Sequence, residues 1–374
     1  MHHARWSVIV GAATAAAALP FAVPVSASTA HDRDDSGTVF VQTNDPAGNG
    51  VVVFHRRGDG TLVALATYFT GGDGGRATGS ASDPLASQGS LLYDEDRGLL
   101  FTVNAGSNSV SVFRVDGDVL HLRQVISSGG SFPTSLTARE DRLYVLNAGG
   151  AANVAGFRIT DDGRLSSIDG ATRALGLSET TPPQFLMAPA QIGLTPDGGQ
   201  LLVTGKTNNF IDVFTVDRNG SLDAPVQTAD ASVPFAFTFS PRGQMDLVNA
   251  AGSLVAAKVQ HDGTITFGTA VANGQTAACW IATIDGHAYV ANTGSNDVSE
   301  YRIDSNGNIT LVNAIEASGI PGAIDETVSG RFLYVQAGLA GEVDVFRVSD
   351  GGALTLVQTV TVPDGGAAEG IAAS

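Results

Sequence analysis

An internal repeat constrains the fold of this chain more than any other feature. The segments LLFTVNAGSNSVSVFRVDGDVLHL (99–122) and AYVANTGSNDVSEYRIDSNGNITLV (288–312) share an apolar run, an Asn/Gly turn and a second run that alternates apolar and polar residues. The residue that ends the first apolar run recurs seven times, at Asn44, Asn104, Asn147, Gly205, Asn249, Asn292 and Ala337. Four of the six spacings are 43 to 45 residues, which is the size of a unit of about four strands.

Each unit carries the signals of short antiparallel strands. A polar turn such as Asp162-Gly163 or Asn219-Gly220 follows the second run and introduces another strand. A short apolar strand precedes most units, as at 189–195, 234–240 and 321–327. Seven units of four strands predict an all-β fold, a single seven-bladed β-propeller over residues 38–374.

The first unit lacks its leading strand, because only the polar segment 28–37 precedes Val39. The missing strand is found at the other end of the chain, where Gly370-Ile371-Ala372-Ala373 follows the seventh unit. We therefore expect the C-terminal segment to complete blade 1 and close the ring, which removes two exposed sheet edges.

The two longer spacings, 60 and 58 residues, locate two insertions at about 70–87 and 171–188. Both lie between the last strand of one blade and the first strand of the next. In a propeller these connections emerge on the same face as the Asn/Gly turns. Long loops on a rigid scaffold commonly carry binding sites, so we expect the functional site on this face.

The charge of the chain excludes two classes of partner. The formal net charge is −17, and the chain contains only two lysines, Lys206 and Lys258. Nucleic-acid binding and attachment to an anionic membrane surface both require a cationic patch. We therefore expect neither partner, and we expect a monomer.

Residues 1–27 have the pattern of a cleaved export signal. An apolar stretch from Val8 to Leu19 follows Arg5, and Val25-Ser26-Ala27 is a small-x-small cleavage site, with a second after Ala30. Residues 1–27 contain one cation and no acid, so their removal changes the net charge from −17 to −18. Cys279 is the only cysteine, which excludes an internal disulfide and a lipid anchor after the signal. The sequence predicts a secreted protein, extracellular or periplasmic.

The repeats resemble those of the beta-propeller lactonase family, which includes 6-phosphogluconolactonase-like and 3-carboxymuconate cyclase-like proteins. The strings SGGSFPTSL (128–136), LYVLNAGG (143–150) and LTPDGGQLLVTGKTNNFIDVF (194–214) carry the resemblance, which is closest to exported members. The resemblance implies a seven-bladed propeller and a lactone-hydrolysing or lactone-forming activity.

This chain departs from the family where its better-known enzymes carry His and Arg after a proline in the innermost strands. The matching positions here are Pro133-Thr134-Ser135, Pro189-Ala190-Gln191 and Pro234-Phe235-Ala236. None of them contains His or Arg. The mature histidines fall on outer strands, in hairpin turns or in the N-terminal segment. The activity implied by the resemblance therefore needs other groups in this chain.

Lactone opening requires a base that activates water and a donor that stabilises the oxyanion. Lys206, Gln191 and Glu326 are our candidates for these roles. Asp325 and Glu326 are adjacent on an innermost strand, where alternation directs them to opposite faces, so we do not expect them to act as a pair. The candidate ligand-binding residues are polar side chains near the insertions or the axis: Asn208, Asn209, Arg173, Gln184, Gln275 and Gln336.

We expect no cofactor and no metal site, although backbone carbonyls in a central channel leave room for a structural cation. Asp304-Ser305-Asn306-Gly307 resembles the start of a calcium loop but lacks the acidic residue that completes one.

Two functions remain open. The first is an exported lactonase or lactonising enzyme that acts on a small, neutral or weakly anionic lactone. The alternative is a non-catalytic propeller that recognises a glycan or a protein.

Overall fold

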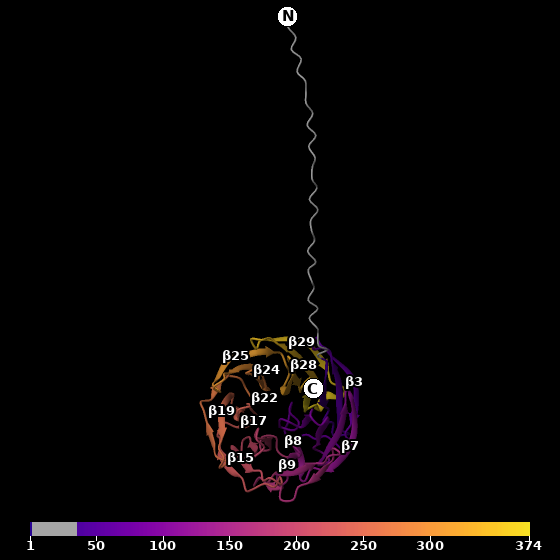
Figure 1. Ribbon diagram of the computed structural model, residues 1–374, viewed down its shortest axis with the longest axis vertical. Helices are drawn as coiled ribbons and strands as arrows, with labels where there is room; N and C mark the ends of the chain where they lie inside the picture. Colours follow the sequence, from indigo (N-terminus) through magenta and orange to yellow (C-terminus); the bar gives the residue numbers. More distant parts are fainter. Residues whose placement is uncertain (2–35) are drawn as a thin grey trace. The chain divides into compact units, whose positions relative to one another are not determined.

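The protein, described by a computed structural model for Met1 and residues 36–374, forms seven antiparallel four-stranded sheets arranged around a ring (Figure 1). The predicted export signal, apart from Met1, and most of the polar segment 28–37 lie outside the described residues. In each sheet the innermost strand contacts the innermost strands of the two neighbouring blades, so the seven strands enclose the axis. The prediction of a seven-bladed propeller is confirmed.

Each blade runs from an innermost strand at the axis to an outermost strand at the surface, and blades 1 to 3 show this order. They consist of β30 (Ile371–Ala373), β1 (Gly37–Gln42), β2 (Gly50–Arg56) and β3 (Leu62–Phe69); β4 (Leu91–Asp94), β5 (Leu99–Asn104), β6 (Ser109–Asp116) and β7 (Val119–Ser127); and β8 (Ser131–Arg139), β9 (Arg142–Gly149), β10 (Asn153–Ile159) and β11 (Leu165–Ser167), with β12 (Arg173–Ala174) also paired to β10.

Blades 4 to 7 follow in the same order. They consist of β13 (Pro189–Leu194), β14 (Gln200–Gly205), β15 (Phe210–Thr215) and β16 (Val226–Ala229); β17 (Pro234–Phe239), β18 (Gln244–Asn249), β19 (Ser253–Val259) and β20 (Ile265–Phe267), with β21 (Val271–Ala272) on β19; β22 (Ala278–Ile284), β23 (His287–Asn292), β24 (Asp297–Ile303) and β25 (Ile309–Ser318); and β26 (Ala323–Ser329), β27 (Phe332–Ala337), β28 (Glu342–Val348) and β29 (Leu354–Thr361).

Burial follows the position of each strand in its blade. The second strands, such as β5 and β27, are buried along their whole length because both faces pack against neighbouring blades. The outer strands, such as β25, alternate between partly buried and exposed residues. The apolar cores lie between blades: Val39 and Phe54 of blade 1 pack in one cluster with Tyr334 and Val345 of blade 7.

The C-terminal strand closes the ring as predicted. β30 pairs antiparallel with β1, with Ile371 opposite Val41 and Ala373 opposite Val39. The short 3₁₀ helix η1 (Gly365–Ala367) leads into it. Without this pairing, β1 would present an unpaired inner edge to the axis.

Glutamine side chains connect neighbouring blades, because each amide bonds both the N–H and the carbonyl of one residue, as a paired strand does. The amide of Gln124 accepts a bond from the backbone N–H of Leu165 (2.6 Å) and donates to its carbonyl (3.1 Å). Gln358 forms the same pair of bonds with Leu62, which joins blade 7 to blade 1. Each pair satisfies a backbone group at a seam where no strand continues the sheet.

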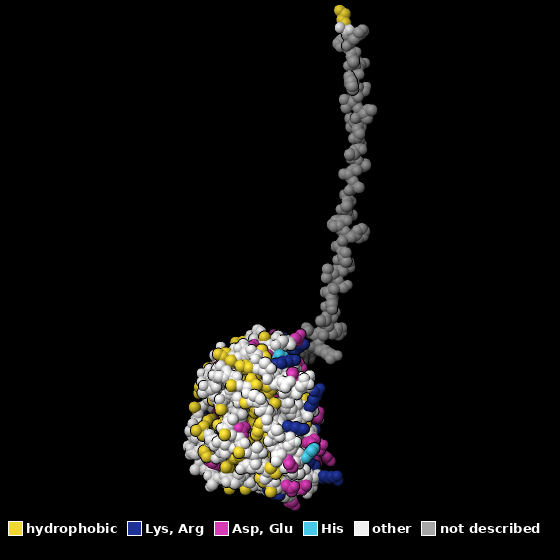
Figure 2. Space-filling model, turned by 90° about the vertical axis from the view of Figure 1, so that its left-hand side faces the viewer, with side chains coloured by type: hydrophobic (Ala, Val, Ile, Leu, Met, Phe, Trp, Pro, Cys, Tyr) yellow, Lys and Arg dark blue, Asp and Glu magenta, His cyan; other side chains and the backbone are white. Residues whose placement is uncertain are grey.

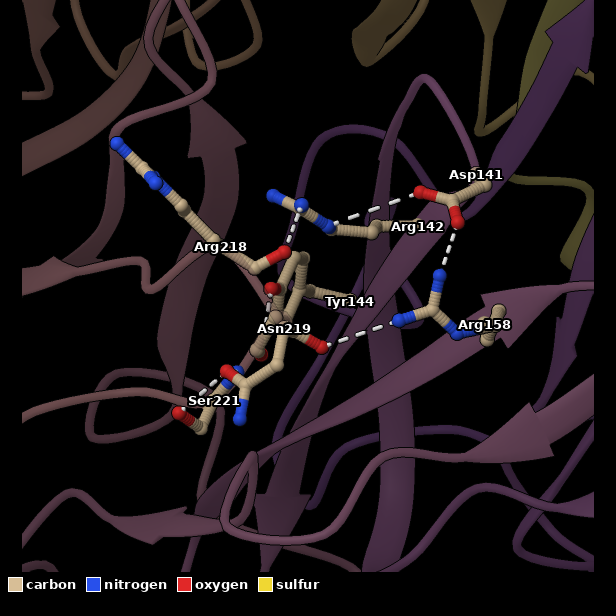
Figure 3. Close-up of polar contacts among 8 residues, drawn as sticks. Asp141, Arg142, Tyr144, Arg158, Arg218, Asn219 and Ser221 are labelled. Atoms are coloured by element: carbon tan, nitrogen blue, oxygen red, sulfur yellow. Dashed lines mark hydrogen bonds and ion pairs between the residues drawn. The ribbon is translucent and has the colours of Figure 1, made fainter.

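Arginine side chains fasten the hairpin turns on the face opposite the insertions, which we call the hairpin face. Between blades 3 and 4, Arg142 donates to the carbonyl of Arg218 (2.6 Å) and Arg158 donates to that of Asn219 (3.2 Å). Arg158 also pairs with Asp141, as Figure 3 shows. These cations therefore serve the packing of blade on blade.

Candidate active site in the axial channel

The first insertion crosses the axial channel. The Trp280 indole on β22 donates to the Ser87 carbonyl (3.1 Å), and the Gln88 amide bonds both the N–H and the carbonyl of Ile281 (3.1 and 3.2 Å). The Ser87 hydroxyl donates to the carbonyl of Thr134 on β8 (2.8 Å). Blades 3 and 6 lie on opposite sides of the ring, so residues 83–88 span the channel. We call this segment the plug.

Three buried ionisable side chains hold the plug. Glu369 accepts bonds from the N–H groups of Leu85 (2.5 Å) and Ser87 (3.4 Å). Asp83 accepts one from the N–H of Ala86 (2.6 Å), and the Lys206 ammonium donates to the Ala86 carbonyl (2.8 Å). Glu369 and Lys206 therefore bind the plug from other parts of the ring, and Asp83 stabilises its turn from within.

Burial dominates the electrostatics of this cluster. It raises the pKa of Asp83 to about 6 and the pKa of Glu369 well above its usual range. Burial also lowers the pKa of Lys206 to about 8, and the ammonium lies 5.2 Å from the Phe185 ring centre and 5.6 Å from that of Phe235. The plug is thus held by an ion cluster that carries little excess charge.

The two insertions meet on one face, as their positions predicted. The Thr78 N–H donates to the Pro183 carbonyl (2.8 Å), and the Phe185 N–H donates to the Thr78 carbonyl (3.0 Å). The second insertion therefore braces the first, and the first closes the channel on this face.

A cavity of about 300 Å³ lies in the channel on the other side of the plug. Gln88 lines it, together with the hairpin-face halves of the innermost strands, including Gln191, Phe237, Asp325 and Glu326. No lysine or arginine of the described chain lines it. Its volume is at the lower end of the range for small-ligand sites.

The two adjacent acids of β26 bring ionisable groups to this cavity. Asp325 is 3% exposed, and burial raises its pKa to about 8, although the nearby backbone N–H groups of Ile371 and Gly370 favour its charged form. Glu326 is 5% exposed, and burial raises its pKa well above the usual range, although the nearby backbone N–H groups of Ala291 and Ala282 favour its charged form. Burial therefore favours the protonated form of Glu326, and Asp325 gains or loses its proton near pH 8.

The structure brings together two of the three side chains proposed for the chemistry. Gln191 and Glu326 line the same cavity, where the Gln191 amide is bonded to the N–H and carbonyl of Phe237 (2.6 and 3.1 Å). Lys206 lies at the plug, and it is 3% exposed. Contrary to the expectation from strand alternation alone, Asp325 and Glu326 both reach the cavity, at a register shift between Ile324 and Glu326.

The proposed ligand-binding residues are spread over several places. Asn208 donates to the Met187 carbonyl (2.8 Å), Asn209 to that of Thr207 (3.1 Å), and Gln184 lies where the insertions meet. Arg173 donates to the carbonyl of Asp223 on the outer part of blades 3 and 4. Gln336 is buried and accepts a bond from the Gly370 N–H (3.1 Å), and the Gln275 backbone is bonded to Asn273. None of these six lines the axial cavity.

Sequence reasoning did not find Gln88, Asp83 or Glu369. Asp83 and Glu369 lie in stretches rich in Gly, Ala, Ser and Pro. The only hint of a role for them in the sequence is that each is an isolated acid among small residues. The proline-linked positions of the innermost strands face the plug: the Thr134 carbonyl accepts from Ser87, and the Ala190 carbonyl accepts from the Gln88 N–H (3.1 Å). The plug therefore packs against the strands that contain these positions.

The described residues contain no group of three or more His, Cys, Asp or Glu arranged to hold a metal ion. Within the same residues, no helix has the length and apolar character that a membrane span requires.

Comparison with known sequences gives one family. A model of the family "Lactonase, 7-bladed beta-propeller" matches residues 256–369. The 6-phosphogluconolactonase of Yersinia pestis (strain Pestoides F) is 25% identical over 285 residues, which cover 69% of this chain and 79% of that protein.

Solved structures share the fold. The periplasmic gluconolactonase of Pseudomonas aeruginosa superposes with a TM-score of 0.71 and 19% identity, over 90% of this chain and 99% of that one. Virginiamycin B lyase of Staphylococcus aureus superposes with a TM-score of 0.51 and 16% identity, over 82% of this chain and 93% of the lyase. A lactonase and a lyase therefore use the same scaffold, and the reaction must be argued from the site.

Proposed function

Because this chain is a member of the seven-bladed beta-propeller lactonase family, we propose that it hydrolyses a small uncharged lactone in the axial cavity. The observation that carries the proposal is the pair Asp325 and Glu326, two buried acids of raised pKa that line one cavity of about 300 Å³. Buried carboxyls in a cleft are candidates for proton transfer because their pKa values approach the working pH.

The two acids take different roles in the proposed reaction. The Asp325 carboxylate removes a proton from water, whose oxygen attacks the lactone carbonyl carbon. The ring C–O bond then breaks, and the Glu326 carboxyl gives its proton to the departing ring oxygen. The product is an open hydroxy acid, and the same groups in the reverse order form the lactone.

The charge of the cavity supports an uncharged substrate. Two acids and no cation line it, so a phosphate or a carboxylate on the substrate would meet repulsion when Asp325 is ionised. Glucono-δ-lactone is a suitable probe, since it carries a lactone, hydroxyls and no charge. The plug closes the insertion face, so this substrate enters from the hairpin face.

Purified protein starting at residue 28 would be offered glucono-δ-lactone, 6-phosphogluconolactone and an aryl lactone, with acid release followed by pH-stat. We expect turnover of the uncharged lactones and a kcat that rises with pH as Asp325 ionises near pH 8. Glu326→Gln and Asp325→Asn should each lower kcat roughly 100-fold or more.

Asp246→Asn is the matched control. Asp246 is also a buried acid, with a pKa that burial raises to about 6, but it does not line the axial cavity. An unchanged kcat in both cavity variants would refute the assignment. Absence of turnover in the wild type would refute the lactonase and favour the non-catalytic binding propeller.

We further propose that the protein is exported and that residues 1–27 are removed. The support is the signal pattern of the sequence and the fold shared with a periplasmic gluconolactonase. Expression of the full chain followed by N-terminal sequencing of the secreted fraction tests this, and a start at Met1 would contradict it.

A further inference from the structure

A groove of about 900 Å³ separates blades 5 and 6 on the hairpin face. The turn 240–244 and residues 256–258 form one wall, and the turn 302–307 forms the other. Figure 2 looks onto the wall of the ring that contains these blades, and its charged side chains, of both signs, gather along one edge. The groove is separate from the axial cavity, with which it shares no lining residue.

Three cations line the groove: Arg242 and Lys258 from blade 5 and Arg302 from blade 6. Lys258 is exposed, whereas the other lysine, Lys206, is buried at the plug. No carboxylate of the described chain lies within ion-pair distance of any of these three cations. Other arginines of the hairpin face, such as Arg158 and Arg331, are neutralised by Asp141 and Asp350.

The one acid that lines the groove is already engaged. Asp304 accepts bonds from the backbone N–H groups of Asn306 (2.7 Å) and Asn308 (2.9 Å) and from the Asn308 amide. These bonds hold its pKa below the usual range, the side-chain amide of Asn308 contributing most. The groove therefore retains an excess of positive charge within a chain whose net charge is −17.

A chain of hydrogen bonds to buried side chains holds the Arg302 guanidinium in one orientation. Its guanidinium donates to His287 Nε2 (2.6 Å) and to the Asp285 carbonyl (3.0 Å). His287 Nδ1 in turn bonds Glu300 Oε1 (2.7 Å), and both His287 and Glu300 are buried. Because Nε2 accepts from Arg302, the imidazole carries its proton on Nδ1. A guanidinium held in this way loses less entropy when it binds a ligand.

Apolar groups complete the lining. Phe267, Ile303 and Ala257 line the groove between the cations. A surface of this kind suits a molecule with an anionic group and a ring or carbon body, since the cations bind the anion and the apolar residues contact the body.

We propose that the groove between blades 5 and 6 is a binding site for an organic carboxylate, bound through Lys258, Arg242 and Arg302. The Arg242 side chain already bridges the blades through the Ser305 carbonyl, so the ligand would lie against a preformed seam. This site is independent of the axial cavity and of the lactonase reaction.

D-Glucuronate is the probe, and D-glucose is its uncharged counterpart, with binding measured by isothermal titration calorimetry at low ionic strength. We expect saturable binding of glucuronate, no binding of glucose, and a Kd that rises as salt screens the cations. Lys258→Gln should raise the Kd about tenfold, and Lys258→Gln with Arg242→Gln should abolish measurable binding.

Arg331→Gln is the matched control, because it removes one exposed cation of the hairpin face outside the groove and should leave the Kd unchanged. Equal binding of glucose and glucuronate would overturn the proposal, as would no glucuronate binding or an unchanged Kd in the double variant with native melting temperature. Glu326→Gln should bind glucuronate like the wild type, so failure of the lactonase proposal and failure of this one are distinguishable.

Discussion

Glu369 connects the plug to the strand that closes the ring, and its replacement by alanine should destabilise both. Its carboxyl accepts the N–H groups of Leu85 and Ser87, and its own N–H donates to the Gln42 carbonyl just before β30. Glu369→Ala leaves two buried N–H groups without an acceptor, at about 1–3 kcal/mol each. The Ser87 contact is long, at 3.4 Å, so we expect a loss of about 2–4 kcal/mol in the free energy of unfolding.

Glu369→Gln distinguishes hydrogen bonding from charge, because it removes the ionisable group and keeps an acceptor oxygen. Burial raises the pKa of the Glu369 carboxyl well above its usual range, and an amide of the same shape keeps one acceptor oxygen for the short bond from Leu85 while losing the long one from Ser87. We therefore expect Glu369→Gln to cost less than about 1 kcal/mol, within the usual net range for one hydrogen bond.

Urea unfolding of the protein starting at residue 28 measures both variants. Trp280 is then the only tryptophan, and its indole is bonded to the plug at Ser87, so its fluorescence also reports the plug in the folded state. Equal losses in the two variants would show that charge rather than hydrogen bonding holds the plug. A loss below about 1 kcal/mol in Glu369→Ala would refute the reasoning.

Three further predictions concern the ring and its axis. Truncation after Asp364 removes β30 and Glu369, and we expect one cooperative loss of the whole β-sheet signal at a lower temperature in circular dichroism; an unchanged melting curve would contradict it. Gln88→Ala breaks both bonds to Ile281 and should cost about 2 kcal/mol in urea unfolding, with Gln124→Ala for comparison at an outer seam. Folded Asp325 keeps its proton up to about pH 8, whereas the unfolded chain releases it near 3.8, so its contribution to stability is full below pH 3.8 and is lost as the pH rises to 8. Between pH 5 and 8, Asp325→Asn should reduce the fall in the free energy of unfolding by up to about 1.4 kcal/mol per pH unit. Equal slopes of the free energy of unfolding against pH in the wild type and the variant would refute the assignment.

The plug explains why the family's site pattern fails in this chain. The carbonyls of Thr134 and Ala190, next to Pro133 and Pro189, accept bonds from Ser87 and Gln88, so the plug packs against these innermost strands. The acids Asp325 and Glu326 lie beyond the plug, toward the hairpin face. A lactonase of this form would bind its substrate from the face opposite the insertions, contrary to our expectation from the sequence.

The blades follow from local patterns in the sequence. Turn residues, alternation and a repeat of about 44 residues act over a few positions each, so the strands, their order and the closure by residues 371–373 could all be predicted. The resemblance to the lactonase family could be predicted as well, since it rests on the same repeated strings.

The arrangement of polar groups at the axis depends on contacts between residues that are far apart in the chain. Glu369 and Leu85 are 284 residues apart, Trp280 and Ser87 are 193 apart, and no local pattern relates them. Burial at the axis then set the pKa values of Asp83, Lys206 and Asp325, because desolvation depends on every blade that surrounds them. Local propensity therefore specified the blades of this protein, whereas packing across the ring specified which polar groups remain at the cavity.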